Sequence, residues 1–427
     1  MQEKQTTTKN WRSVLSLGIS ALGILFFLIQ ALSLAVFWLI SLVNAQSDLT
    51  QIISIGLLVW SSILSGAVLM PAFLLSLYQM RGQSIPHWLD TRRPAIRKIV
   101  MWIILVWPMF VFLGWLIAGR PTLAIYLLGP INLFVAGLPV LWIYNAAQSK
   151  LEGGSQQRKW RIFAFSLTLM PVLVILFELL ALLVMGGFGG LWLAYRFSVD
   201  PQLEGQMMEI LNQLMAMGDD LDAMIKLLEP YILQPSVIFW ALAIFGGIMP
   251  IIEEIVKPMA LWSLAGRKIR PQEGFVGGLL CGAGFALIEN VLYFTTAIIA
   301  EDWLFMAIGR AGTGVLHMLA SGLVGWGLAS AWRDGKWGFL GLTTLGAFIL
   351  HGLWNALSLV FGVLPLYLVE GQPTLDQTLL FYVPVIGLLL LSVLGMVLIN
   401  RYFRNKNRLL TASNEKLSIS AEKSPAE

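Results

Sequence analysis

Long apolar segments follow one another along almost the whole chain. Runs of about 20 residues or more occur at residues 13–43, 51–80, 99–118, 122–147, 162–194, 236–260, 274–300, 303–331, 337–362 and 379–400. Each run is long enough to cross a hydrocarbon core of about 30 Å as an α-helix. The pattern therefore predicts an all-α, polytopic membrane protein, built as a helix bundle with about ten transmembrane helices.

The composition strengthens this interpretation. Hydrophobic residues make up 57% of the chain, charged residues make up 12%, and the mean hydropathy is +0.77. These values exclude an ordinary soluble domain, in which about 25% of the residues are charged. The single cysteine, Cys281, excludes an internal disulfide and any metal cluster that needs several thiolates from this chain.

The basic residues gather in alternate loops between the apolar runs. They are Lys4, Lys9, Arg12, Arg81, Arg92, Arg93, Arg97, Lys98, Lys150, Arg158, Lys159, Arg161, Arg267, Lys268, Arg270, Arg333, Lys336, Arg401, Arg404, Lys406 and Arg408. Because Lys and Arg are concentrated in cytoplasmic loops, we expect these loops and both termini to be cytoplasmic. The pI near 9.1 then reflects loop asymmetry, and we expect no nucleic-acid partner.

Polar residues divide the chain into unequal parts. Residues 1–194 form an N-terminal five-helix membrane region with few ionisable groups inside its apolar runs, whereas residues 236–400 form a five-helix module that contains most of them. Residues 195–235 are expected to be an extracytoplasmic connector. Residues 401–427 form a basic cytoplasmic tail that is expected to be disordered from about residue 409, because it is rich in Ser, Lys and Glu. The second module is the expected catalytic region.

The connector carries apolar residues at helical spacing, which predicts an amphipathic helix. These residues are Met207, Met208, Leu211, Leu214 and Met215. The pattern stops at Gly218, and a second short helix is expected from Leu221 to Leu228. Such a pair can lie on a membrane surface.

Five titratable residues lie inside the apolar runs of the catalytic module. They are Glu253, Glu254, Glu289, His317 and His351. A charged side chain at the centre of a membrane helix costs roughly 2.5 kcal/mol or more, so such residues usually serve a function. Because they fall on four neighbouring spans, we expect them to form one active site within the membrane.

Other side chains lie one helical turn or less from these five. Lys257 is placed to pair with Glu253 or Glu254, at i,i+4 and i,i+3. Pro250 and Pro258 bracket this stretch and predict a kinked helix. Further supporting residues are Phe285, Asn290, Ser321 and Asn355. We expect them to orient the titratable groups.

Two features of the neighbouring spans complete the pattern. Gly278 and Gly282 form a small-residue pair, which lets helix backbones approach closely. Arg310 lies only about seven residues into its span, where a long side chain can reach the membrane surface and serve a structural role.

Taken in order, these residues form four motifs, each with its own spacing. The motifs are Glu253-Glu254-x-x-Lys257, Phe285-x-x-x-Glu289-Asn290, His317-x-x-x-Ser321 and His351-x-x-Trp354-Asn355. Together they resemble the PrsW family of intramembrane proteases, distant relatives of the CAAX prenyl proteases and bacteriocin-processing membrane proteins. The resemblance covers about residues 236–360. It implies cleavage of a membrane-anchored protein such as an anti-sigma-factor-like regulator, by a multi-pass protein of the cell (plasma) membrane.

Two mechanisms fit these residues. In the first, one glutamate takes a proton from water, and we place this role at Glu254 in preference to Glu253. His317, His351 and Asn355 then polarise the scissile carbonyl. The absence of a carboxylate beside either histidine in its own motif favours this metal-free version.

In the second mechanism, His317, His351 and Glu289 bind a divalent metal such as Zn²⁺ with an open position for water. The glutamate pair then supplies the base. The chain lacks the HExxH motif of many zinc proteases. The cofactor expectation is therefore either none or one divalent ion.

Two other classes of protein compete with a protease. A proton-coupled transporter also places titratable residues in the membrane, but it usually has two corresponding halves, and here the polar residues lie in one half with no visible repeat. A catalytically silent scaffold or immunity-type protein would tolerate loss of the glutamates. Replacing Glu254 with glutamine separates the three classes.

Overall fold

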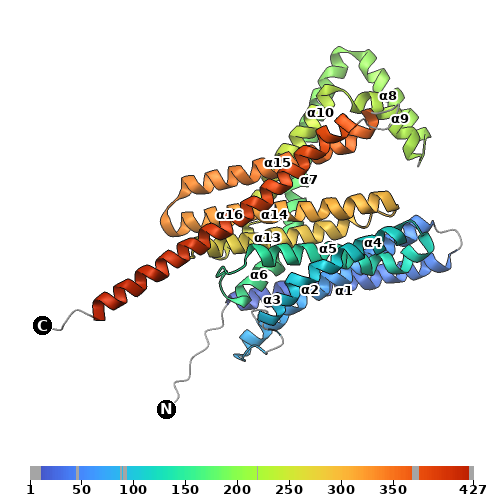
Figure 1. Cartoon of the computed structure of the whole chain (residues 1–427). Coiled ribbons are helices and arrows are strands. Elements are labelled where there is room, and N and C mark those ends of the chain that lie inside the picture. The colour runs from blue at the N-terminus through green and yellow to red at the C-terminus, as the bar shows by residue number, and fades with distance from the viewer. Residues whose placement is uncertain are drawn as a thin grey trace. The chain divides into compact units, whose positions relative to one another are not determined.

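The predicted all-helical architecture is confirmed. A computed structural model describes residues 11–44, 48–86, 89, 94–218, 220–367 and 375–422, and within these residues the chain forms helices and turns and no strands (Figure 1). Ten helical segments of the described chain are long and apolar enough to cross a membrane. They are Trp11–Val43, Leu49–Met80, Lys98–Ala118, Pro121–Ala147, Gln156–Val199, Pro235–Trp262, Pro271–Tyr293, Ala300–Asp334, Trp337–Val360 and Tyr382–Thr411.

The individual helices follow the predicted runs closely. They are α1 (Trp11–Val43), α2 (Leu49–Met80), α3 (Pro94–Ile103), η2 (Ile104–Val106), α4 (Trp107–Ala118), α5 (Pro121–Ala147), α6 (Gln156–Leu167), α7 (Leu169–Val199), α8 (Pro201–Ala216), α9 (Leu221–Ile232), α10 (Pro235–Ala241), η3 (Leu242–Ile248), α11 (Met249–Val256), α12 (Met259–Trp262), α13 (Pro271–Tyr293), α14 (Ala300–Asp334), α15 (Trp337–Tyr367) and α16 (Leu375–Glu422).

The helices group into two compact units that alternate along the chain. Unit 1 contains Met1–Pro171, Lys257–Ala347 and Leu389–Glu427, and unit 2 contains Val172–Val256 and Phe348–Leu388. The division at residues 194 and 236 that the sequence suggests stays a prediction.

Unit 1 contains the tightest helix pair, α13 and α14. Cβ atoms added at Gly278 and Gly282 of α13 would meet the backbone carbonyl oxygens of Ser321 and His317 on α14. The predicted close approach at these glycines is therefore confirmed. It brings the backbone of α13 directly against the α14 turn that carries His317.

This contact gives a stability prediction. Replacing Gly282 with alanine should destabilise the folded protein by about 1–3 kcal/mol, because a methyl group forced into a packed interface displaces the backbone. Gly309 on α14 is a matched control, since its added Cβ would meet no heavy atom within 4 Å. Its change to alanine should instead stabilise the helix by roughly 0.5–1 kcal/mol. Thermal unfolding midpoints in one detergent measure both changes, and equal shifts would contradict the packing described.

Side-chain hydrogen bonds join α5 to α14 and to α16. Trp303 of α14 is fully buried, and its Nε1 donates a hydrogen bond of 2.8 Å to Asn132 Oδ1 on α5. Asn400 of α16 donates from Nδ2 to the carbonyl oxygens of Ala147 and Ser149, at 2.8 and 2.9 Å. The two bonds from Asn400 give hydrogen-bond donors to carbonyl groups at the C-terminal end of α5, which have no partner within the helix.

Unit 2 contains the two helices predicted in the connector. Asp200 caps α8 by accepting a hydrogen bond from Leu203 N (3.3 Å), and Asp220 caps α9 in the same way from Ala223 N (3.0 Å). Gly218 between them has φ +60°, a conformation that glycine adopts without a steric cost. Both helices and the break between them are as expected.

The span with the glutamate pair is irregular. It begins as α10, widens into the π-helical segment η3, and continues as α11, which carries Glu253 and Glu254 and ends at Val256. A turn at Lys257 and Pro258 follows. The kinked helix predicted from Pro250 and Pro258 is confirmed, and the π-helical segment lies directly before Met249 and Pro250.

One prediction about the tail is wrong for the described residues. Residues from 409 onward were expected to be disordered, yet α16 is helical through Glu422. No glycine or proline occurs between Gly395 and Pro425, and leucine, lysine, glutamate and alanine in this stretch favour a helix. The helix of the last span therefore continues into the polar sequence.

Candidate active site

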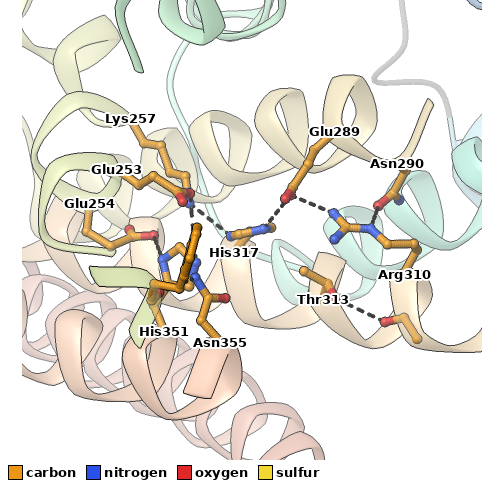
Figure 2. Close-up of polar contacts among 12 residues, drawn as sticks. Glu253, Glu254, Lys257, Glu289, Asn290, Arg310, Thr313, His317, His351 and Asn355 are labelled. Atoms are coloured by element: carbon orange, nitrogen blue, oxygen red, sulfur yellow. Dashed lines mark hydrogen bonds and ion pairs between the residues drawn. The ribbon is translucent and has the colours of Figure 1, made fainter. Parts of the chain in front are cut away.

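The first polar cluster lies in unit 1, on the α13 and α14 pair. His317 of α14 is buried, and its Nε2 lies 2.8 Å from Glu289 Oε2 on α13. Its other ring nitrogen, Nδ1, lies 2.9 Å from the Nζ of Lys257. Figure 2 shows the ring between these two partners. Two residues predicted for the site, Glu289 and His317, are thus in direct contact.

These partners determine the tautomer of His317. A lysine ammonium only donates hydrogen bonds, so Nδ1 accepts from Lys257. An ionised carboxylate only accepts, so Nε2 carries the proton and donates it to Glu289. Phe285 lies with its edge against the imidazole, with ring centroids 5.0 Å apart, and also lies 4.1 Å below the Lys257 Nζ. The predicted supporting residue Phe285 therefore packs against both His317 and Lys257.

Arg310 belongs to this cluster, and the interpretation that it extends to the membrane surface is wrong. The residue is 9% exposed, its Nη2 lies 2.5 Å from Glu289 Oε2, and its Nε donates to Asn290 Oδ1 at 2.8 Å. A guanidinium enters such an environment where a carboxylate compensates its charge. Position along the span suggested the surface, but the carboxylate partner lies on another helix.

The second polar cluster lies in unit 2 and joins α11 to α15. Glu254 is 0% exposed, and its Oε1 lies 2.9 Å from His351 Nδ1. The other ring nitrogen of His351, Nε2, lies 3.8 Å from Glu253 Oε2. Figure 2 shows both carboxylates turned toward this imidazole. Three predicted site residues are thereby brought together.

The two clusters correct one argument drawn from the sequence. Neither histidine has a carboxylate in its own motif, a pattern that by itself favours a metal-free reaction. In the structure His317 contacts Glu289, and His351 contacts Glu254. Each carboxylate comes from a different helix, so local spacing could not indicate it.

The remaining supporting residues have different positions. Asn290 and Ser321 are buried, and Asn290 accepts from Arg310 as described. Asn355 donates from Nδ2 to the carbonyl oxygen of Phe245 at 3.1 Å, within the π-helical segment η3. A π-helical turn shifts backbone bonding from the usual pattern, and Asn355 supplies a donor there. Its described contact is to the backbone of the span that carries the glutamates.

The fold and the two clusters define a class of protein. Carboxylates buried against imidazoles on membrane-spanning helices mark a candidate functional site within the membrane. Residues 207–389 match the family model described as PrsW family intramembrane metalloprotease. Over this region the chain is similar to the PrsW family, and its candidate spans are those of a multi-pass membrane protein.

The matched region extends beyond the four motifs on both sides. It starts inside α8 and ends inside α16, so it includes α9, whereas residues 1–206 lie outside it. No curated protein and no solved structure matches the chain. The family match and the side-chain geometry therefore carry the functional argument.

The family description implies a metal, and the donor atoms of unit 2 fit one. His351 Nε2 and Glu253 Oε2 are ligand types that zinc accepts, and their 3.8 Å separation is too long for a direct hydrogen bond. Glu254 holds the opposite nitrogen of the same ring, as a carboxylate commonly does behind a metal-binding histidine. In unit 1, both ring nitrogens of His317 contact protein partners.

Proposed function

We propose that this protein is an intramembrane protease that hydrolyses a peptide bond of a membrane-anchored protein, with Glu253, Glu254, Glu289, His317 and His351 acting in one site. The observation that carries the proposal is the pairing of each histidine with a carboxylate from another helix. Such pairing orients an imidazole for proton transfer or for binding an ion. A purely structural role would not require two such pairs within the region of the family match.

The assignment of both clusters to one reaction rests on the sequence. Lys257 of the first cluster is the third residue after Glu254 of the second. Even fully extended, three residues span only about 11 Å. Both ends of this short segment contact a site histidine.

The geometry supports different roles for the two glutamates. Glu254 is fully buried and holds His351 Nδ1, which suits an orienting carboxylate. Glu253 faces the other ring nitrogen and is slightly more exposed, at 8%. We therefore assign proton transfer from water to Glu253 with the Nε2 of His351, and this reverses the preference for Glu254 that the motif alone suggests.

Lys257 is the best-placed cation for the developing oxyanion. It is fully buried and donates a hydrogen bond to His317. A fixed positive charge in a water-poor site stabilises negative charge that develops in the transition state. In this assignment His317 orients Lys257, while Glu289 orients His317.

A divalent ion is compatible with the same residues. The ligands that the sequence suggested are His317, His351 and Glu289. Among them only His351 has a ring nitrogen that faces a carboxylate beyond hydrogen-bond distance, so Glu253 and His351 would hold the ion. When bound, such an ion polarises a carbonyl group and lowers the pKa of a bound water. Under that arrangement Glu254 keeps its orienting role on His351.

The substrate class follows from the position of the site. Site residues lie within membrane-spanning helices, so a substrate must present its peptide bond at membrane depth. We propose a protein anchored by a transmembrane segment, such as an anti-sigma-factor-like regulator, in the plasma membrane.

The test compares new protein N-termini in membranes from cells that express the wild type or the double variant Glu253→Gln/Glu254→Gln at equal abundance. The double variant removes both carboxylates, so the result does not depend on which one accepts the proton. A new terminus in or beside a transmembrane segment, present only with the wild type, is the expected result. Identical profiles under several stress conditions would contradict the proposal and favour a transporter or a silent scaffold.

A further inference from the structure

Arg310 lies in unit 1, outside the four motifs, and contacts three residues of α13. It lies on α14, seven residues before His317, and is nearly buried. Its guanidinium contacts Glu289 and Asn290, and its central carbon lies 4.5 Å from the centre of the Tyr293 ring. All three partners lie on the last turns of α13. The mechanism described above gives Arg310 no role.

The contacts use the fork of the guanidinium. Nη2 donates to the Glu289 carboxylate, while Nε donates to the side-chain oxygen of Asn290. Two donors in one rigid plane fix both the distance and the direction of their acceptors. A lysine at this position would keep the charge but would present one nitrogen, without the planar fork.

One oxygen atom links Arg310 to the site. Glu289 Oε2 accepts from Arg310 and also lies 2.8 Å from His317 Nε2. Any rotation of the carboxylate that moves this oxygen changes both contacts together. Arg310 therefore limits the positions from which Glu289 can accept the His317 proton.

The chain of contacts continues through the imidazole ring. With the Nε2 proton directed at Glu289, Nδ1 presents a lone pair to Lys257. Phe285 packs edge-on against the ring and limits its rotation. The contacts thus run from Asn290 and Arg310, through Glu289 and His317, to the ammonium group of Lys257.

We propose that Arg310 is a positioning residue of the protease, which holds Glu289 so that His317 keeps its Nε2–H tautomer and its Nδ1 contact with Lys257. The expected effect of Arg310 on the cleavage rate rests on the proposed function. Its expected effect on the tautomer of His317 does not. Arg310 itself touches no reacting atom. Its role is to hold the Glu289 carboxylate in one orientation. This role requires the planar guanidinium, and a positive charge alone is not enough.

The experiment combines nitrogen NMR of histidine-labelled, chelator-treated protein with cleavage kinetics. The chain has three histidines, so loss of a signal in His317→Gln assigns that residue. The variants are Arg310→Met, which removes every donor, and Arg310→Lys, which keeps the charge. Arg158→Met is the matched control, because it breaks an Arg–Glu pair of 3.1 Å to Glu273 on the same helix α13.

The wild type should show His317 as one neutral tautomer with protonated Nε2. Arg310→Met should show a mixture of tautomers and lose roughly 10–100-fold in kcat, the usual effect of removing an orienting partner. Arg310→Lys should lose about tenfold in kcat with KM unchanged. Arg158→Met should leave the His317 signals and kcat as in the wild type.

Two results would overturn the proposal. One is a single Nε2–H tautomer and normal kcat in both Arg310 variants. The other is a wild-type His317 that is not the Nε2–H tautomer. If Arg310→Met fails to fold, the Arg310→Lys comparison decides. The NMR result does not require proteolysis, so failure of the proposed function and failure of this role are separately visible.

Discussion

Replacing Glu253 with glutamine should lower kcat for cleavage of a membrane substrate by about 10³-fold, within the range for loss of a general base. Glutamine keeps the shape of the side chain but cannot accept a proton from water. Glu253 Oε2 faces His351 Nε2, so the change removes the carboxylate nearest that nitrogen. The measurement is kcat on a substrate identified through its new N-terminus. Glu209→Gln, on the exposed surface of α8, should behave as the wild type.

Glu254→Gln provides the comparison that separates the two glutamates. It should also lower kcat strongly, because glutamine can donate to His351 Nδ1 and so reverse the tautomer that Glu254 imposes. The difference should appear in histidine NMR, where only Glu254→Gln changes the tautomer of His351. A Glu253→Gln protein with normal kcat beside an inactive Glu254→Gln protein would show that Glu254 is the base.

Removing the negative charge of Glu289 should have the second large effect. Glu289→Gln leaves the Arg310 guanidinium without its carboxylate and gives His317 a weaker partner. Breaking a buried ion pair on one side costs about 3–5 kcal/mol, and we expect about 3 because the Glu289 side chain is 23% exposed. Thermal or denaturant unfolding in one detergent measures the loss.

The double variant Glu289→Gln/Arg310→Met tests the cause of that loss. With both charges removed, no uncompensated guanidinium remains, so much of the stability should return. Activity should not return, since His317 still lacks the carboxylate that orients it. Recovery of activity together with stability would contradict a role for Glu289 in the reaction.

The hydrophobic pattern predicted the spans well because membrane helices require long apolar runs whatever their neighbours are. The expected run at residues 337–362, for example, corresponds to the span Trp337–Val360. The close contact at Gly278 and Gly282 was also predictable, because small residues allow backbones to approach. The five titratable site residues were also predictable, because a charged side chain inside a membrane helix has a high free-energy cost and is usually functional.

Partners from other helices could not be predicted. Arg310 was interpreted from its depth alone, whereas its position is decided by Glu289 on α13. The carboxylate beside His351 is Glu254, 97 residues earlier in the chain. Such contacts depend on how helices pack, and the spacing of residues within one helix does not predict them. The kink predicted at Pro250 did not indicate that the preceding residues, Leu242–Ile248, would form a π-helical turn.

The most direct test of the central claim uses purified protein in lipid vesicles with a single-span substrate, in water enriched in ¹⁸O. Hydrolysis by activated water should place ¹⁸O in the new C-terminal carboxyl group, at a position inside the transmembrane segment, as read by mass spectrometry. The Glu253→Gln/Glu254→Gln protein should give no such product. Cleavage at the wild-type rate by that variant, or cleavage only outside the membrane segment, would contradict the account.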